Sequence, residues 1–537
     1  MAADAASRPH RRTVLRAGTA LAAAAGLTAC ADIRHDAAAA PVHTEGVGSV
    51  GTAGSEAVAA YAPDWAALTR SLHGPVIRPG DSRYTAAQHL FQPRYDGVHP
   101  AAVAYPASAA DVAACVSFAR KYRLPLSARN GGHSYGGWSK AAGGLVVDLG
   151  RLNTVRTVPG GAVVGAGARL IDVYSQLNAH GVTIPAGSCP TVGVTGLTLG
   201  GGVGVTGRAY GLTCDNLTGA QIVTAAGRIL DVDATHHADL FWALRGGGGG
   251  NFGIVTQLRF RTHPAPDCAY AFLSWNWSQA ADVIRAWQAW APSAPDRLWS
   301  NLHVSASSDG RLRIASTCVM VGATQAELSA QIRRLTVRPA SVGLHSASFF
   351  HTMQVMGGVA GESVSQAHVR GPLPGQTANG LVGRSSYGAR SDFYTRPLSA
   401  AGARAVVAAV ARYPRSAPAG GRAAVAFDAL GGAINRIPVT ATAFAHRNAL
   451  FLAQYTADYP AGVTGGSAAD RSWAWLDGTW HSLRGFASGA AYQNYLDPHL
   501  PNWAQAYYGP NLSRLQAVKR AYDPSDLFHF PQSIPLR

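Results

Sequence analysis

Short β-branched runs alternate with amphipathic helical patterns through the first half of the chain. Residues 145–149 and 162–165 are rich in Val and Leu, which is typical of short buried strands. Residues 170–179 carry apolar side chains three and four positions apart, which predicts a helix with one buried face. A second helical pattern covers residues 111–122, and Ser108 is suited to cap it. The mixture predicts an α+β fold rather than a repeating βαβ wind.

Strand and helix patterns continue to alternate toward the C-terminus, and the amino-acid composition changes near residue 264. Residues 221–224 and 228–232, joined through Gly227, predict a β-hairpin. Beyond residue 264 glycine becomes sparser and most of the tryptophans occur, which predicts a second α+β domain. Its expected helices cover 281–291, 323–336 and 399–413, and its expected strands cover 424–428 and 449–456. The last fifty residues are rich in aromatic and turn residues, and we expect them to be ordered and held against the rest of the fold.

Residues 1–30 resemble an export signal. An arginine pair precedes an apolar run over residues 17–29, which is too short to span a bilayer and suits a signal peptide. The pair resembles a twin-arginine signal, and the ending Leu-Thr-Ala-Cys at 27–30 resembles a lipoprotein cleavage box. We therefore expect an exported protein whose only membrane link is a lipid anchor at Cys30. The alternative is ordinary secretory cleavage at nearby alanines. Residues 31–60 are rich in Ala, Gly, Ser and Val with few large apolar side chains, which predicts a flexible tether.

Composition excludes several other classes. The 537 residues are 47% hydrophobic and 14% charged, unlike a disordered or coiled-coil chain. The formal net charge is +16, but no Lys/Arg stripe is interleaved with aromatic residues, so we expect no nucleic-acid partner. The six cysteines form no C-x-x-C pair and no zinc spacing, so we expect no metal.

Three glycine-rich clusters surround residues that can do chemistry. Residues 129–137 place His133 between glycine pairs, residues 187–204 contain Cys189, and residues 246–250 are five successive glycines. Such clusters let a backbone approach a ligand closely and present N–H groups to phosphates. Taken singly, they are also compatible with an ordinary turn or a flexible linker. Residues 165–170 start like a G-x-G-x-x-G fingerprint but lack its third glycine, which argues against a Rossmann site.

Together the clusters resemble the berberine bridge enzyme-like flavoprotein oxidases, which have the FAD-binding fold of the vanillyl-alcohol oxidase group. The resemblance extends to the Tyr-x-Asn-Tyr-x-Asp motif at 492–497 and to the Tyr-Asp-Pro and Phe-Pro-Gln of the tail. It implies an α+β protein with a two-part FAD-binding domain, formed by residues 61–263 and 488–537. Residues 264–487 would be the inserted α+β substrate-binding domain.

The resemblance implies FAD attached through two covalent bonds. His133 matches the residue bonded to the flavin 8α-methyl carbon, and Cys189 matches the residue bonded to flavin C6. Val192 matches a position where valine accompanies O₂ reactivity, which favours an oxidase over a dehydrogenase. The other cofactor contacts that we expect are Asn130, Gly131, Gly132, Ser134, Gly193, Gly200, Gly201, Gly253, Val255 and Asn494.

The tail is expected to supply the catalytic base. If residues 492–496 are extended, Tyr492 and Asn494 share one face and Tyr495 lies on the other. Because the asparagine lies by the flavin in this family, we expect Tyr492 to take the substrate hydroxyl proton as a hydride leaves for the flavin. Its pKa must then fall from about 10. Tyr495 is the second candidate, and Asp428 and Gln454 match substrate-contacting positions more loosely.

The predicted function is therefore an exported FAD-dependent oxidase. Its small-molecule substrate would be an alcohol or a sugar hemiacetal, and O₂ would be reduced to H₂O₂. One alternative is a tailoring oxidase that acts on an aromatic or glycosylated secondary metabolite. Another is a catalytically inactive lipoprotein that binds at the cell surface. Residues 431–436 lack the inserted glutamate of the alkaloid-cyclising members, which argues against berberine bridge chemistry itself.

Overall fold

The computed structural model describes residues 62–460 and 462–537, so the expected signal, the tether and Cys30 lie outside the described residues. A four-stranded sheet of order β1-β2-β4-β3 begins the fold, with β2, β4 and β3 parallel. The strands are β1 (Val76–Ile77), β2 (Ala102–Ala104), β3 (Leu126–Arg129) and β4 (Leu145–Asp148). Its helices are α2 (Trp65–Ser71), α3 (Tyr84–Gln88), η1 (Pro93–Tyr95) and α4 (Ala109–Tyr122). The side chain of Ser108 caps α4 as predicted, by accepting from the Asp111 N–H at 3.1 Å.

A five-stranded antiparallel sheet of order β5-β6-β10-β8-β9 packs beside the first sheet. Its strands are β5 (Val155–Val158), β6 (Gly161–Gly165), β8 (Leu217–Val223), β9 (Ile229–Asp233) and β10 (Ile254–Arg261). The predicted hairpin is confirmed as β8 and β9, and Gly227 takes the positive φ of 78° that its turn requires. The connections hold β7 (Val182–Thr183), β11 (His263–Pro264), α5 (Leu170–Asn178), α6 (Val194–Leu199), α7 (Gly207–Tyr210), η2 (Thr213–Asn216) and α8 (Ala238–Ala243).

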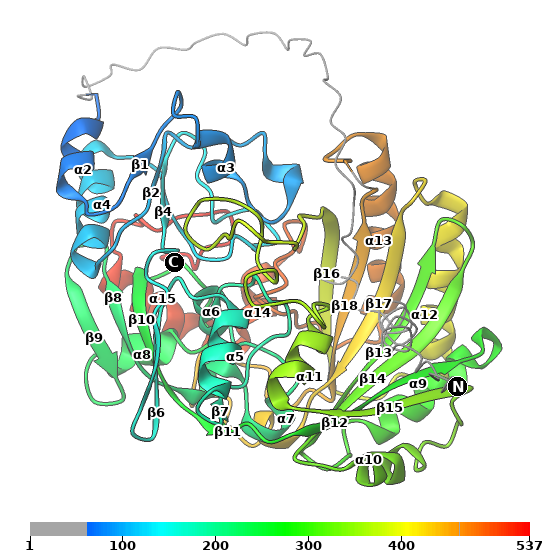
Figure 1. Ribbon diagram of the computed structural model, residues 1–537. Coiled ribbons are helices and arrows are strands. Elements are labelled where there is room, and N and C mark those ends of the chain that lie inside the picture. The colour runs from blue at the N-terminus through cyan, green and yellow to red at the C-terminus, as the bar shows by residue number, and fades with distance from the viewer. Residues whose placement is uncertain (1–61, 461) are drawn as a thin grey trace, which may run out of the picture.

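A seven-stranded antiparallel sheet of order β15-β12-β14-β13-β17-β18-β16 forms the other half of the molecule (Figure 1). Its strands are β12 (Cys268–Trp275), β13 (Leu298–Ser307), β14 (Leu312–Val321), β15 (Ser341–Ala347), β16 (Tyr387–Tyr394), β17 (Arg422–Ala429) and β18 (Phe451–Asp458). Helices α9 (Ala280–Trp290), α12 (Ala400–Ser416) and α13 (Ser467–Arg484) cover its outer face. The remaining short elements are η3 (Trp277–Gln279), α10 (Gln325–Ile332), α11 (Phe349–Met356) and η4 (Gly432–Ile434). The helices and strands predicted for this region are therefore confirmed within a few residues.

Strand alternation gives this sheet two different faces. Trp287 of α9 packs against the rings of Phe427 and Phe451, and its indole N–H donates to Ser300 at 2.9 Å. The neighbours of these strand residues, Trp299 and Asp428 among them, point the other way, toward the first two sheets. One face thus forms a core with the helices, and the other is available to line a cavity.

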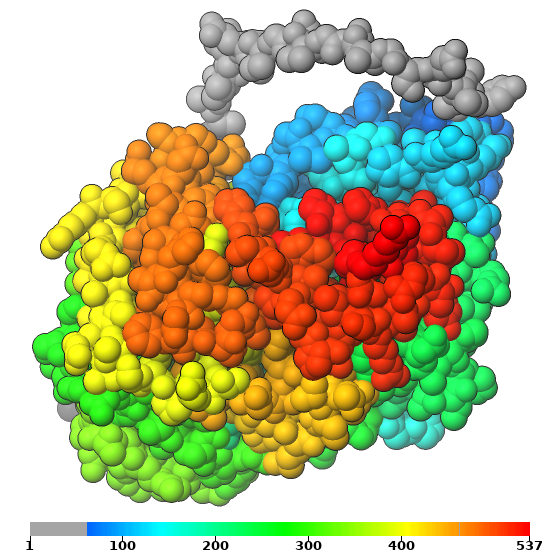
Figure 2. All heavy atoms as spheres, turned by 180° about the vertical axis from the view of Figure 1, so that it is seen from behind, coloured from blue at the N-terminus to red at the C-terminus, as the bar shows by residue number. Residues whose placement is uncertain are grey.

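The C-terminal segment lies across the seam between the two halves (Figure 2). It contains α14 (Trp503–Tyr508), η5 (Gly509–Asn511) and α15 (Leu512–Tyr522). Lys519 is fully buried, pairs with Asp523 at 2.7 Å, and donates to the backbone oxygens of Asn251 and Phe528 at 3.0 and 2.8 Å. These contacts confirm the expectation that the tail is tied down.

Two buried arginines also join the halves. Arg208 of α7 donates to the carbonyls of Leu298, Pro292, Ala294 and Leu430 on the substrate side. The Arg447 guanidinium pairs with Asp215, and both side chains are almost fully buried. Because every one of these donors has an acceptor, the two halves meet in a defined geometry. Within residues 62–460 and 462–537, no helix has the length and apolarity that a membrane span needs.

Candidate active site

A cavity of about 370 Å³ lies where the three sheets and the C-terminal segment meet. Most of the residues singled out from the sequence line it. They are Asn130, Gly131, Gly132, His133, Ser134, Cys189, Val192, Gly193, Gly253, Val255, Asp428, Gln454, Tyr492, Asn494 and Tyr495. Gly200 and Gly201 are not among the lining residues. The structure therefore brings together residues separated by more than 300 positions in the chain.

His133 is held as a neutral imidazole at one end of this cavity. Its ring stacks on Phe91, with centroids 4.0 Å apart, and its Nε2 is 2.9 Å from the Thr191 hydroxyl. Burial, helped by the nearby Arg169 charge, lowers the pKa of His133 to about 3. A neutral imidazole keeps a lone pair, so His133 is suited to be a nucleophile near neutral pH.

The glycines around His133 are required by close packing of two loops. A Cβ on Gly131 would collide with the backbone of Gly193, and a Cβ on Gly193 would collide with the Asn130 amide. Asn130 in turn donates to the Ala166 carbonyl and accepts from Arg169. These contacts fix the two loops against each other. Gly196 of α6 differs, because a Cβ placed there would meet no atom within 4 Å.

Tyr492 is an anchor within the C-terminal segment. Its hydroxyl oxygen accepts from the N–H groups of Gly202 and Val203 at 2.9 and 3.1 Å, and from the Asn494 amide at 2.9 Å. The side chain is only 1% exposed. Burial raises the pKa of Tyr492 to about 12, although these three donors act to lower it. The expected lowering of the Tyr492 pKa is therefore absent.

The prediction of an extended segment at 492–496 is wrong. The N–H of Tyr495 donates to the Tyr492 carbonyl at 2.8 Å, which closes a turn, so alternation by two does not apply. Gly200 and Gly201 make room for this turn. A Cβ on Gly200 would collide with the Asn494 amide, and one on Gly201 would lie 2.9 Å from the Phe444 ring.

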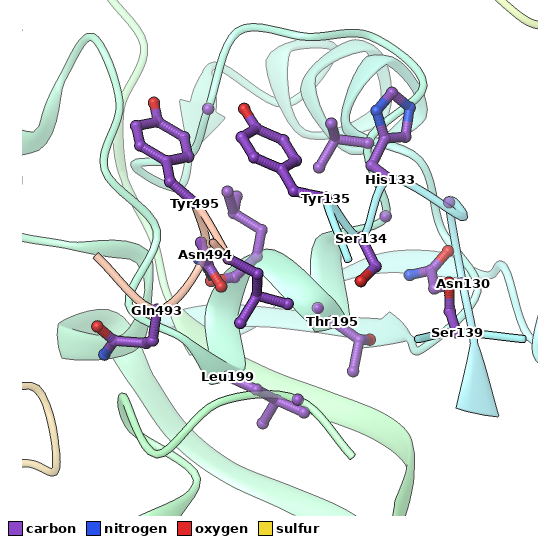
Figure 3. Close-up of a pocket in the computed structure, with 18 of the residues that line it drawn as sticks. Asn130, His133, Ser134, Tyr135, Ser139, Thr195, Leu199, Gln493, Asn494 and Tyr495 are labelled. Atoms are coloured by element: carbon purple, nitrogen blue, oxygen red, sulfur yellow. Dashed lines mark hydrogen bonds between the residues drawn. The ribbon is translucent and has the colours of Figure 1, made fainter. Parts of the chain in front are cut away.

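Tyr495 is the tyrosine of the motif whose hydroxyl is available. Its ring stacks on Tyr135 with centroids 5.4 Å apart and planes 4° apart, and the two hydroxyls lie at the same end of the stack (Figure 3). The Tyr135 hydroxyl accepts from the Gln454 amide at 2.8 Å. The Tyr495 hydroxyl has no hydrogen bond to any residue that the structure describes.

The carboxylate of Asp428, on β17, acts electrostatically on this pair. Its negative charge helps to raise the pKa values of both Tyr135 and Tyr495. Burial raises the pKa of Asp428 itself to about 7. A carboxyl group of that pKa changes its charge near neutrality. It is therefore suited to exchange a proton during a reaction.

Sequence reasoning missed the polar row that β13 adds to this wall. Trp299, Asn301 and His303 alternate along the strand and all line the cavity. Asn301 stands opposite Asp428 in the register, and its amide nitrogen is 3.1 Å from the His303 ring. The polar residues at alternate positions in 299–303 could have revealed this row. The residues on the other face of the strand are mostly apolar, however, so the run also fits an ordinary core strand.

Comparisons with known proteins agree with this geometry. A model of the FAD binding domain matches residues 100–233, and a berberine and berberine-like model matches residues 491–535. The chain is 32% identical to YvdP of Bacillus subtilis, an uncharacterized FAD-linked oxidoreductase, over 86% of this chain and 98% of that protein. It is 31% identical to the chitooligosaccharide oxidase of Gibberella zeae, over 81% of this chain and 87% of that enzyme. The solved structure of Physcomitrella patens BBE-like 1 superposes with a TM-score of 0.77 at 30% identity, covering 88% of this chain and 99% of that one.

The residues present fit FAD. The matched FAD binding domain supplies the loop of His133, and the berberine-like match supplies Tyr492, Asn494 and Tyr495. Gly196 leaves open the space that any side chain would fill, on the same wall as Cys189. The cavity thus offers a glycine-lined cradle with a neutral imidazole and a cysteine on its walls.

The anchoring role of Tyr492 predicts a loss of stability in Tyr492→Phe. The change removes the acceptor of two backbone N–H groups, that of buried Gly202 and that of partly buried Val203, which costs about 2 kcal/mol of the free energy of unfolding. Urea unfolding would measure it as a lower midpoint. Tyr495→Phe is the matched control, because it removes a hydroxyl with no described partner and is expected to cost less than about 0.5 kcal/mol. Equal midpoints for the two variants would contradict the anchoring role.

Proposed function

The chain belongs to the berberine bridge enzyme-like family of FAD-linked oxidoreductases, and we propose that it oxidises a hydroxyl-bearing carbon of a carbohydrate, with O₂ as acceptor. FAD, when bound, supplies the hydride acceptor and passes the electrons to O₂, giving H₂O₂. The protein residues must then bind the sugar, orient the reacting hydroxyl and accept its proton.

The observation that carries this proposal is the wall formed by β13, β17 and β18. Trp299, Asn301, His303, Asp428 and Gln454 line the same cavity as the glycine loops. The indole nitrogen of Trp299 and Nδ1 of His303 are buried and have no hydrogen-bond partner among the described residues. Buried polar atoms of this kind are costly unless a ligand pairs with them. An aromatic ring beside several unpaired polar groups suits a sugar, whose faces are apolar and whose edges carry hydroxyls.

We propose Tyr495 and Asp428 as the groups that accept the proton. The substrate O–H proton passes to the Tyr495 hydroxyl as that phenol releases its own proton toward the Asp428 carboxylate. Burial, together with the charges of Tyr135 and Asp428, raises the pKa of Tyr495 well above 10, so the phenol alone is a poor base near neutrality. The carboxylate of Asp428 removes that difficulty, because it takes the proton in the same step.

We also propose that His133 and Cys189 each hold FAD through a covalent bond. The neutral state of His133 and the position of both residues on the cavity wall support this. A covalently held cofactor leaves the protein free to open the sugar side of its cavity. The arginine pair and apolar run within residues 1–30 further support export with a lipid anchor at Cys30.

A panel of mono- and oligosaccharides tests the reaction through H₂O₂ release. We expect release with at least one sugar. Tyr495→Phe should lower kcat by about 100-fold or more, the usual contribution of a general base. Its flavin content should stay unchanged, which separates a catalytic effect from loss of cofactor. Absence of peroxide with every sugar would contradict the substrate class and favour an aromatic or glycosylated secondary metabolite.

The pKa of Asp428 predicts how activity depends on pH. Below about pH 7 the carboxyl group is protonated and cannot accept a proton, so kcat/KM should fall as pH decreases below 7 and level off above it. Asp428→Asn should lower kcat/KM and remove this inflection. His303→Gln is the cavity control that should keep it, because burial lowers the pKa of His303 to about 4. An unchanged inflection in Asp428→Asn would disprove the assignment.

Acid precipitation tests the covalent bonds. The yellow colour should stay in the pellet for the wild type and for His133→Ala and Cys189→Ala, since each single variant keeps one bond. Only the double variant should release flavin to the supernatant. Colour in the supernatant of the wild type would refute covalent attachment and leave the family assignment intact.

A further inference from the structure

A second cavity, of about 320 Å³, lies outside the candidate active site. One wall comes from α5 and its N-cap, with Arg169, Asp172 and Gln176, and the other comes from the loop over residues 364–377. Gln176 is exposed, so the cavity opens to solvent, while Arg169 at its inner wall is only 7% exposed. Eight of the eleven lining residues have polar side chains, which is unusual for an ordinary packing defect.

The Arg169 guanidinium uses only part of its hydrogen-bonding capacity. Nη1 donates to Asn130 Oδ1 and to the Gly167 carbonyl. Nε and Nη2 have no acceptor, and no carboxylate lies within ion-pair distance, among the residues that the structure describes. Burial lowers the pKa of Arg169, because it disfavours the charged guanidinium. The negative charges of Asp148 and Asp172 act in the opposite direction but offset this effect only in part. The cavity therefore contains a buried cation whose charge is only partly compensated and whose Nε and Nη2 are unpaired among the described residues.

The other charged groups of the cavity satisfy each other. Nε2 of His368 lies 3.1 Å from the Asp172 carboxylate, and its Nδ1 lies 2.8 Å from the Val364 carbonyl. Burial acts to lower the pKa of His368, but these two acceptors raise it overall. The Asp172 carboxylate is thus engaged by His368, and Arg169 is the other cationic side chain among the residues that line the cavity.

The loop on the far wall is built around this guanidinium. Gly375 has a φ of 78°, and a Cβ there would collide with Nη2 of Arg169. The glycine thus lets the loop pack closely against the guanidinium, while Nε and Nη2 along its edge have no acceptor among the described residues. That edge presents two parallel N–H donors, the geometry that binds a carboxylate or phosphate through two oxygens.

We propose that this second cavity binds a small oxyanion, a carboxylate or a phosphate group, on the Nε–Nη2 edge of Arg169. The Ser365, Gln376 and Gln176 side chains are the polar groups on the cavity wall that would meet the rest of the ligand. The hydrogen bond from Arg169 to Asn130 uses only Nη1. It does not explain why a polar cavity lies beside the remaining donors of the guanidinium. The proposal does not depend on the reaction in the first cavity.

Binding is measured on the flavin-loaded full-length protein with inorganic phosphate and with acetate, each titrated against chloride at constant ionic strength. We expect a saturable rise of the melting temperature and matching heats in calorimetry. Arg169→Gln should weaken binding by about tenfold or more, the value of a charged hydrogen bond. Binding of phosphate alone identifies a phosphate ligand, binding of acetate alone identifies a carboxylate, and either supports the proposal.

Because Arg169 also holds Asn130, a charge series at exposed Gln176 gives an independent test. Gln176→Lys should strengthen oxyanion binding and Gln176→Glu should weaken it, each by about threefold, since a nearby surface charge acts through screened solvent. Gln325→Glu, at the exposed start of α10, is the matched control and should change nothing. No saturable binding of either anion beyond chloride, or equal affinity across the Gln176 series, overturns the proposal even if Arg169→Gln fails to fold.

Discussion

A single buried phenol oxygen holds the active-site end of the chain in place. The Tyr492 hydroxyl accepts hydrogen bonds from two backbone N–H groups after α6 and from the amide of Asn494. Each donor would be costly to bury without an acceptor, so the C-terminal turn can settle in only one position. That position decides that Tyr495 stacks on Tyr135 and faces the wall of the seven-stranded sheet. The cavity is therefore completed by the C-terminal segment.

The same low-polarity surroundings tune two groups in opposite directions. Burial disfavours charge, so it lowers the pKa of His133 to about 3 and raises that of Asp428 to about 7. His133 thereby keeps its lone pair near neutral pH, as the proposed bond to FAD requires. Asp428 is poised to gain and lose a proton, as turnover requires. One physical effect thus keeps His133 neutral and brings the pKa of Asp428 near neutrality within the same cavity.

The sequence predicts the elements and the glycine loops well because their signals are local. Ser108 caps a helix, Gly227 turns a hairpin, and the cluster around His133 forms a tight loop, all from a few neighbouring residues. The Tyr492–Leu496 segment was misjudged because a turn and an extended run can share one sequence. The turn is selected over the extended run by the hydrogen bonds of Tyr492 with Gly202 and Val203, which lie about 290 positions away in the sequence. Trp299 and His303 were missed for the related reason that one face of β13 is ordinary core.

The two cavities meet at one amide. Asn130 lines the first cavity and accepts from Nη1 of Arg169, whose Nε and Nη2 belong to the second. An anion on that outer edge does not compete for Nη1, so it leaves the bond to Asn130 in place and restricts the guanidinium further. Asn130 also packs against Gly193, in the loop that carries Cys189. Arg169 thus connects the two cavities through Asn130, which lies between the loop of His133 and the loop of Cys189.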